Sequence, residues 1–166
     1  MSKIAPCLWF DGQAEDAAKL YTSLFPDSRI DKVTRSPADN PSTPEGAVLT
    51  VDFTLAGQKF IGLNGGPDFH FSEAVSFTID CADQAEVDRY WNALISGGGE
   101  PSQCGWLKDR FGLSWQVIPR QLNEYLGGAD PDGARRAMEA MLQMAKLDVA
   151  KLREAYEGKA EPARVR

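Results

Sequence analysis

The sequence predicts an α+β protein in which one strand–helix–strand unit occurs twice and is followed by a helical segment. The first observation is a repeat, because Gln13-Ala14-Glu15 recurs as Gln84-Ala85-Glu86 at the start of two amphipathic segments. The second is alternation of polar and apolar residues around both segments, which is typical of half-buried strands. The third is a change to helical spacing after Pro119. Since neither small sheet could bury its face alone, the repeat indicates one pseudo-symmetric domain.

The first unit is expected to contain one helix between strands. The predicted segments are a strand at 4–10, a helix at 13–25 with an apolar stripe of Ala17, Leu20, Tyr21 and Leu24, and strands at 29–35, 47–55 and 58–64. Pro26 ends the helix, because proline cannot continue it. Alternation in the third strand places Val51, Phe53 and Leu55 on one face, and Ala56-Gly57 makes the turn of a hairpin.

The second unit repeats this plan with a strand at 74–80 and a helix that runs to about Ile95. Asp83 is expected to cap this helix, with Glu86 completing a capping box. The stretch from Cys104 to Pro119 predicts two short strands joined by a turn, in which the Asp109 carboxylate accepts hydrogen bonds.

Helical patterns fill the rest of the chain. Residues 120–126 predict a short helix, and Pro131 starts a long amphipathic segment from Asp130. One continuous stripe from Met138 to Tyr156 fits its spacing, although Asp148 could instead cap a second helix. The expected domain division is therefore 1–119, with modules at about 3–66 and 73–119, a helical extension at 120–158 and a tail at 159–166.

Charge and composition exclude some partners. The chain has 166 residues and a formal net charge of −6, which argues against binding to nucleic acid or to an anionic membrane. No apolar run is long enough for a secretory signal or a membrane span. Cys7, Cys81 and Cys104 are widely spaced, so we expect buried free thiols in a cytoplasmic protein.

Polar residues on one face of the predicted strands are the candidate site. Ser114 and Gln116 share a face, whereas Trp115 is expected to join the core with Trp9. The ligand-pocket candidates are Ser76, Thr78, Gln116, Ser114, Asn64 and Trp106. A solvated sheet face is the open alternative. His70, the only histidine, is expected to be a surface loop residue.

Several ordered motifs resemble one family. They are GGP at 65–67, CGWLKDRFG at 104–112 and SWQVIP at 114–119. The resemblance is to the PhnB-like, demethylubiquinone methyltransferase-like family of the glyoxalase/bleomycin resistance/dioxygenase (vicinal oxygen chelate) superfamily. It implies two βαβββ modules whose curved sheets enclose a cleft, in a homodimer that can exchange modules.

The resemblance also implies where a divalent metal would be held in catalytic members of the superfamily. The corresponding positions here are Pro6, Ser76, Gln116 and one near Phe60, Gly62 or Asn64. Proline cannot ligate through its side chain, and neutral oxygens give little charge to hold a hard dication. We therefore expect no metal and no cofactor.

Three functions follow as alternatives. The leading one is a metal-free protein that binds a small, partly apolar ligand in the cleft, with turnover left open. The others are a metal-dependent glyoxalase- or dioxygenase-type enzyme acting on a vicinal-oxygen or aromatic substrate, and a dimeric scaffold. Methyltransferase activity is not expected, because the first turn, 10–13, lacks the glycine pattern of a nucleoside-binding fold.

Overall fold

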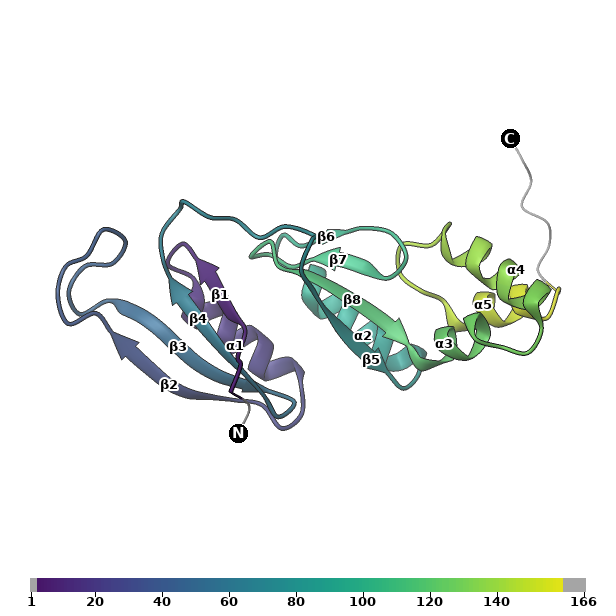
Figure 1. Cartoon of the computed structure of the whole chain (residues 1–166), viewed down its shortest axis with the longest axis horizontal. Coiled ribbons are helices and arrows are strands. Elements are labelled where there is room, and N and C mark those ends of the chain that lie inside the picture. Colours follow the sequence, from purple (N-terminus) through teal and green to yellow (C-terminus); the bar gives the residue numbers. More distant parts are fainter. Residues whose placement is uncertain (1–2, 160–166) are drawn as a thin grey trace. The chain divides into compact units, whose positions relative to one another are not determined.

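The structure is a computed structural model in which residues 3–159 are described. These residues form two compact units, and the chain passes from the first to the second between Phe71 and Ser72. Figure 1 shows that each unit has a sheet with a helix on one face, and that further helices follow the second sheet. The α+β class and the repeated plan predicted from the sequence are confirmed.

The first unit has the predicted order of a strand, a helix and three strands. The elements are β1 Cys7–Phe10, α1 Ala14–Leu24, β2 Arg29–Arg35, β3 Val48–Leu55 and β4 Gln58–Asn64. The sheet order is β1-β4-β3-β2, in which β1 pairs parallel to β4 and the other pairs are antiparallel. Strand β1 starts later than predicted, after Pro6, which has no N–H to give to a sheet.

Helix α1 lies close to its sheet because small residues face the strands. Its fully buried positions are Ala14, Ala17, Ala18 and Tyr21. A Cβ built on Gly62 of β4 would lie only 3.2 Å from the Ala14 Cβ, so this glycine permits the close approach. Leu20 and Leu24 of the predicted stripe are only half-buried.

The second unit repeats the arrangement with a shorter hairpin. The elements are β5 Ser76–Cys81, α2 Gln84–Ile95, β6 Glu100–Pro101, β7 Trp106–Lys108 and β8 Ser114–Pro119. The order β5-β8-β7-β6 again contains one parallel pair, between β5 and β8. The cap on α2 is confirmed, since Asp83 Oδ1 accepts from the Glu86 N–H at 2.9 Å. Glu86 Oε2 in turn accepts from the Ala82 N–H at 2.8 Å.

The helical extension belongs to the second unit and contains α3 Arg120–Leu126, α4 Pro131–Met141 and α5 Val149–Tyr156. The prediction of one continuous stripe up to Tyr156 is therefore wrong, and its alternative holds. Asp148 caps α5 by accepting from the Lys151 N–H at 3.0 Å. The break between the helices lets Leu147 and Leu152 form a buried cluster with Leu122.

The segment between α4 and α5 is bonded to the sheet part of the same unit. The N–H groups of Cys104 and Gly105 donate to the carbonyls of Met144 and Ala145, at 2.7 and 2.8 Å. Gln84 Nε2 donates to the Leu147 carbonyl at 3.1 Å. Backbone hydrogen bonds as well as apolar contacts therefore hold the extension against the sheet part of the second unit.

Within residues 3–159, no helix is long and apolar enough to cross a membrane. Except for Lys159, the predicted tail at 159–166 lies outside the described residues.

Candidate functional site

Strand register arranges the polar residues of the second sheet in two rows on the face opposite α2. In the first row Ser76 pairs with Ser114, and Ser114 with Lys108. The second row contains Thr78, Gln116 and Trp106. Residues between these positions, such as Trp115 and Val117, point to the helix and are buried. The alternation predicted for β8 is therefore confirmed.

One hydrogen bond joins the two rows. Gln116 Nε2 donates to Ser76 Oγ at 2.9 Å, so the two candidates from β8 and β5 are neighbours. Thr78, the register partner of Gln116, is exposed. The sheet thus brings five of the six predicted ligand-pocket residues onto one face.

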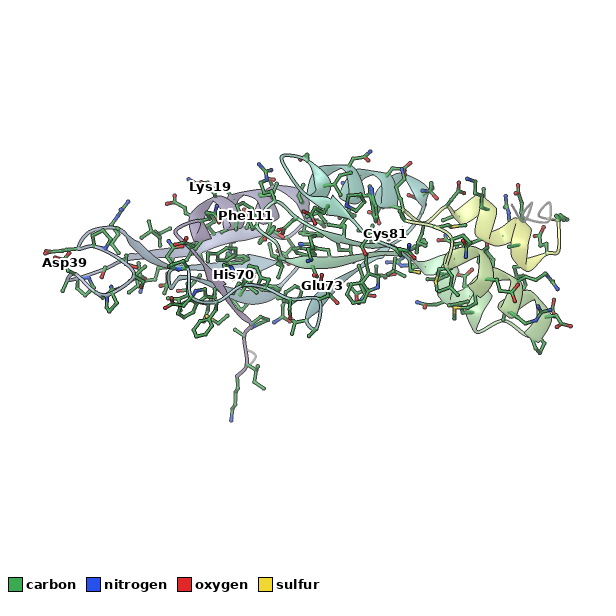
Figure 2. The ribbon with its side chains drawn as sticks, turned by 90° about the horizontal axis from the view of Figure 1, so that it is seen from above. Lys19, Asp39, His70, Glu73, Cys81 and Phe111 are labelled. Atoms are coloured by element: carbon green, nitrogen blue, oxygen red, sulfur yellow. The ribbon has the colours of Figure 1, made fainter. Side chains whose placement is uncertain are left out.

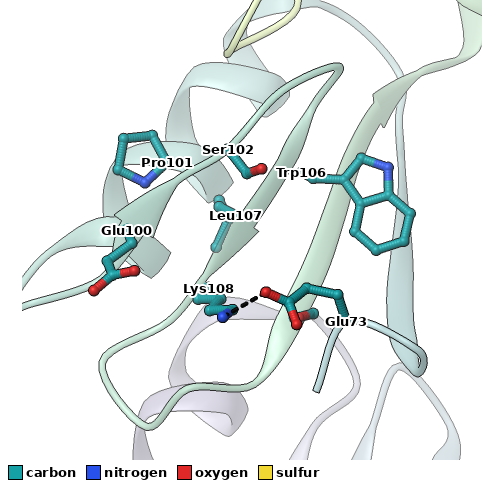
Figure 3. Close-up of a pocket in the computed structure, with 8 residues that line it drawn as sticks. Glu73, Glu100, Pro101, Ser102, Trp106, Leu107 and Lys108 are labelled. Atoms are coloured by element: carbon teal, nitrogen blue, oxygen red, sulfur yellow. Dashed lines mark ion pairs between the residues drawn. The ribbon is translucent and has the colours of Figure 1, made fainter. Parts of the chain in front are cut away.

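A pocket of about 140 Å³ lies at one end of this face (Figure 3). Its lining residues are Glu73, Glu100, Pro101, Ser102, Trp106, Leu107, Lys108 and Ser114. Of the predicted candidates, Ser114 and Trp106 belong to this lining, whereas Ser76, Thr78 and Gln116 lie on the same face outside it. Glu73 and Lys108 were missed by the sequence analysis, although alternation with Trp106 would have placed Lys108 on this face.

Ser114 is the most constrained polar group of the pocket. Its side chain is only 1% exposed, and its Oγ has no hydrogen-bond partner within the described residues. A buried hydroxyl without a partner is costly, because it has lost its bonds to water. A ligand atom in the pocket could supply that bond.

An ion pair stands beside this hydroxyl. Lys108 Nζ lies 2.5 Å from Glu73 Oε1, and Figure 3 shows the two side chains turned toward each other. The hydrogen bond from Lys108 lowers the pKa of Glu73 below its ordinary value, and the same contact raises the pKa of Lys108. Both groups are therefore charged at neutral pH.

Asn64 lies in the other unit, and its side chain has structural partners. Its Oδ1 accepts from the Ala14 N–H at 2.9 Å, and its Nδ2 donates to the Val48 carbonyl at 2.9 Å. Both polar atoms thus hold the first turn of α1 and the start of β3. A ligand-binding role for Asn64 stays a prediction.

Of the predictions for Asp109 and Trp9, the first is confirmed and the second is wrong. Asp109 is the turn acceptor that was expected, because its Oδ1 accepts from the N–H groups of Phe111 and Leu113. Its Oδ2 accepts from the buried Trp115 Nε1 at 2.9 Å. The prediction that Trp9 joins the core is wrong, because Leu8 and Phe10 fill the helix-facing positions of β1.

Trp9 instead packs at the end of β4. Its Nε1 donates to the Gly66 carbonyl at 2.8 Å, and its ring meets Phe69 edge-on with centroids 4.9 Å apart. A Cβ on Gly65 would overlap the indole, so the GGP motif makes room for this ring. His70 is exposed in the loop after β4, as predicted (Figure 2).

The cysteines are free, but the expectation that all are buried is wrong. Cys7 is exposed, because it lies on the face of β1 opposite Leu8, and Cys104 is half-buried. Cys81 is buried, and burial raises the pKa of its thiol to about 12. This thiol is protonated at neutral pH and is a poor nucleophile.

A second and larger hollow, of about 460 Å³, lies between α2 and the extension. Its charged groups have partners within the protein, as shown by Lys146 Nζ at 2.6 Å from Asp88 Oδ1. Gln84 in the same wall is bonded to the Leu147 carbonyl and the Val149 N–H. We favour the smaller pocket, because its lining includes Ser114, one of two described residues with a buried side-chain atom that lacks a partner, whereas the other, Gln121, lines neither pocket.

The residues of the open face do not fit a divalent metal. The side chains of Ser76 and Gln116, at positions that the family resemblance gives to metal ligands, are neutral and bonded to each other. The nearby Glu73 carboxylate is bound to Lys108, whose positive charge would repel a cation. No group of three His, Cys, Asp or Glu side chains that could hold an ion occurs within residues 3–159.

Solved structures of other proteins share this architecture. The fosfomycin resistance protein FosX from Mesorhizobium loti matches with a TM-score of 0.53 at 15% identity, over 77% of this chain and 100% of that one. Protein PA1353 from Pseudomonas aeruginosa gives a TM-score of 0.54 at 19% identity, over 72% and 98%. This chain therefore shares its fold with both proteins, and each of its sheets is accompanied by one helix, as the resemblance implied.

Closer matches identify the family. A PhnB protein from Bacillus cereus is 33% identical, with a TM-score of 0.64 over 71% of this chain and 99% of that one. The family model of 3-demethylubiquinone-9 3-methyltransferase matches residues 2–118. The chain therefore belongs to this PhnB-like family, and the match ends before the helical extension. No curated protein matches the sequence.

Proposed function

We propose that this protein binds a small, partly apolar molecule on the open face of its second sheet, without a metal. The observation that carries the proposal is the pocket of about 140 Å³, because its lining includes Ser114, whose buried hydroxyl has no hydrogen-bond partner within the described residues. Trp106 supplies apolar area on the same wall, and the Gln116–Ser76 pair extends the polar rows beyond it. Whether the bound molecule is also turned over is left open.

The alternative is a metal-dependent enzyme of the same fold, acting on a vicinal-oxygen or aromatic substrate through Gln116 and its neighbours. Elemental analysis of the purified protein, with thermal unfolding in Ni²⁺, Mn²⁺, Zn²⁺ and EDTA, separates the two functions. A metal-free binder keeps its melting temperature in all four conditions. A stoichiometric metal, or a melting temperature that depends on one, would establish the alternative instead.

Methyltransferase activity finds no support in the site, despite the family's name. Nucleoside-binding methyltransferases use a parallel sheet with a glycine-rich turn after its first strand. Here each sheet has one parallel and two antiparallel strand pairs. The turn after β1 has a single glycine, Gly12, and is therefore not glycine-rich.

Ligand binding itself is tested by fragment screening with nuclear magnetic resonance on the whole chain. Fragments that bind the proposed site are expected to shift the backbone signals of β7 and β8. The Trp106→Ala variant is expected to bind these fragments more weakly. Tyr125→Ala, in the helical extension, is the control for loss of an aromatic ring elsewhere. Hits that shift only signals outside the second sheet would refute the proposed site.

Self-association and location complete the proposal. We place the protein in the cytoplasm, which three free cysteines support. We also expect a homodimer, with or without exchange of modules. Light scattering on the whole chain and on a chain ending at Pro119 tests whether the extension contributes to the dimer.

A further inference from the structure

The polar end of the pocket combines one cation with one unpartnered hydroxyl. Lys108 and Ser114 are register partners on β7 and β8, so their side chains lie next to each other on the open face. The ammonium can only donate hydrogen bonds, whereas the hydroxyl can donate one and also accept. A group with two acceptor atoms would match both donors.

In the structure a carboxylate, which has two acceptor atoms, already binds Lys108. Glu73, in the segment before β5, contributes the carboxylate that binds Lys108 Nζ. The Glu73 side chain is 63% exposed, and the side chain that binds its carboxylate is Lys108. Because exposed ion pairs are weak, an incoming carboxylate could compete with Glu73 for the lysine.

The ligand body is limited by the size of the pocket and by Trp106. An engineered cavity of about 150 Å³ in another protein takes up benzene, and this pocket measures about 140 Å³. The indole of Trp106, seen at the pocket in Figure 3, offers a flat apolar surface suited to stacking on a ring. The pocket therefore suits one ring with a small head group.

We propose that the ligand of this pocket is a single-ring aromatic carboxylate, whose carboxylate takes the place of Glu73 on Lys108 and accepts a hydrogen bond from Ser114 Oγ. This inference rests on the proposed binding function and adds the chemical class of the ligand. Glu73 is then an internal competitor that occupies the lysine when no ligand is bound. A cationic ligand, attracted by Glu73 and Glu100, is the opposite result that the test must distinguish.

Three isosteric probes separate charge from shape: benzoate, benzamide and benzamidine. Each is titrated into the whole chain, and binding is followed by the backbone signals of β7 and β8. We expect benzoate to bind about tenfold more tightly than benzamide, because hydrogen bonds to a charged acceptor are the stronger ones. Benzamidine is expected to bind most weakly, because it brings a second cation to Lys108.

Variants then test the roles of individual side chains. Glu73→Gln removes the competing charge, and benzoate affinity should rise roughly two- to fivefold, while benzamide affinity stays the same. Lys108→Met should abolish the preference for benzoate, and Ser114→Ala should weaken benzoate by about fivefold. The control is Glu139→Gln on α4, which removes a similarly exposed carboxylate from an ion pair with Arg135.

The outcomes separate this inference from the function on which it rests. If the three probes bind without a preference for benzoate, or Glu73→Gln leaves benzoate affinity unchanged, the carboxylate assignment is overturned and the binding function stands. Preferred binding of benzamidine overturns it in the same way. If no probe or screened fragment shifts the signals of the second sheet, the proposed function fails and this inference fails with it.

Discussion

The same pair of sheet positions is bonded differently in the two units. In the first unit Lys59 and Thr54 face each other across β4 and β3. Asp31 of β2 binds both, at 2.8 Å from Lys59 Nζ and 2.6 Å from Thr54 Oγ1. Arg29 Nε adds a third contact to this carboxylate at 2.9 Å. Every polar side chain in this network therefore has a partner inside the unit.

In the second unit Ser114 and Lys108 face each other across β8 and β7, the counterparts of β4 and β3, so that the hydroxyl and the lysine are exchanged between the strands. The acid that binds the lysine is not on a neighbouring strand but on the exposed segment before β5, at Glu73. Its carboxylate meets Lys108, while Ser114 Oγ keeps no partner among the described residues. With the acid of the second unit outside the sheet, its buried hydroxyl is unpaired within the described residues, whereas that of Thr54 in the first unit is paired.

The helices show a related difference. In each sheet the first strand pairs parallel to its neighbour, and the last residues of the two strands are register partners. These partners are Phe10 and Asn64 in the first unit and Cys81 and Pro119 in the second. Asn64 bonds the first turn of α1, where Gln13 makes no side-chain cap. Pro119 has no polar side chain, and α2 is capped locally by Asp83. The first unit thus depends on a long-range cap, and the second on a local one.

The largest effect should come from Asn64→Ala. Asn64 is 6% exposed, and its removal leaves the Ala14 N–H and the Val48 carbonyl without their partner. We expect a loss of about 2–4 kcal/mol in the free energy of unfolding, measured by urea denaturation.

The control for this change is Asp83→Ala at the other helix. It removes a solvent-accessible cap and should cost about 1 kcal/mol. Equal losses in the two variants would contradict the distinction between a long-range cap and a local one.

Asp31→Ala should have the next largest effect. Thr54 is only 2% exposed, so loss of its acceptor leaves a buried hydroxyl unpaired, and we expect a cost of about 1–2 kcal/mol. The hydrogen bond from Lys59 holds the pKa of Asp31 below its ordinary value of 3.8. A carboxylate with a lowered pKa stabilises the fold above its unfolded-state pKa and loses that contribution as the pH falls.

The pH dependence gives the measurement. Wild type and Asp31→Ala should differ fully at neutral pH, and the difference should shrink as the pH falls below about 3.8. A difference that stayed constant through this range would show that the carboxylate charge contributes nothing to the network.

Most of the fold could be predicted because its signals are local. Alternation within β3 and β8, the cap at Asp83 and the repeat at Gln13 and Gln84 each depend on residues near one another in the chain. The break before Asp148 was only one of two options, because a cap and a continuous stripe fit the same spacing there.

The site was predicted only in part, because its contacts are long-range. Alternation put Ser114 and Trp106 on an open face, but nothing local shows that Glu73 meets Lys108. Asn64 was named a pocket candidate as a polar residue of a predicted strand, and in the structure its side chain bonds the Ala14 N–H at the start of α1. Trp9 was assigned to the wrong face, since a short strand of mostly apolar residues has no polar residue to fix its phase.

The smallest effect on stability, and the most informative one, is expected from Ser114→Ala. Because Ser114 Oγ has no partner within residues 3–159, its removal breaks no hydrogen bond to these residues and relieves an unsatisfied buried group. We expect the free energy of unfolding to stay within about 0.5 kcal/mol of wild type or to rise.

Thr54→Val in the first unit is the matched control, because the Thr54 hydroxyl does have a partner, and this variant should lose about 1 kcal/mol in the free energy of unfolding. If Ser114→Ala destabilised the protein as much as Thr54→Val, the hydroxyl would serve folding in both units. A stable Ser114→Ala protein that binds benzoate weakly would instead show that the second unit keeps this group for a ligand at the expense of its own stability.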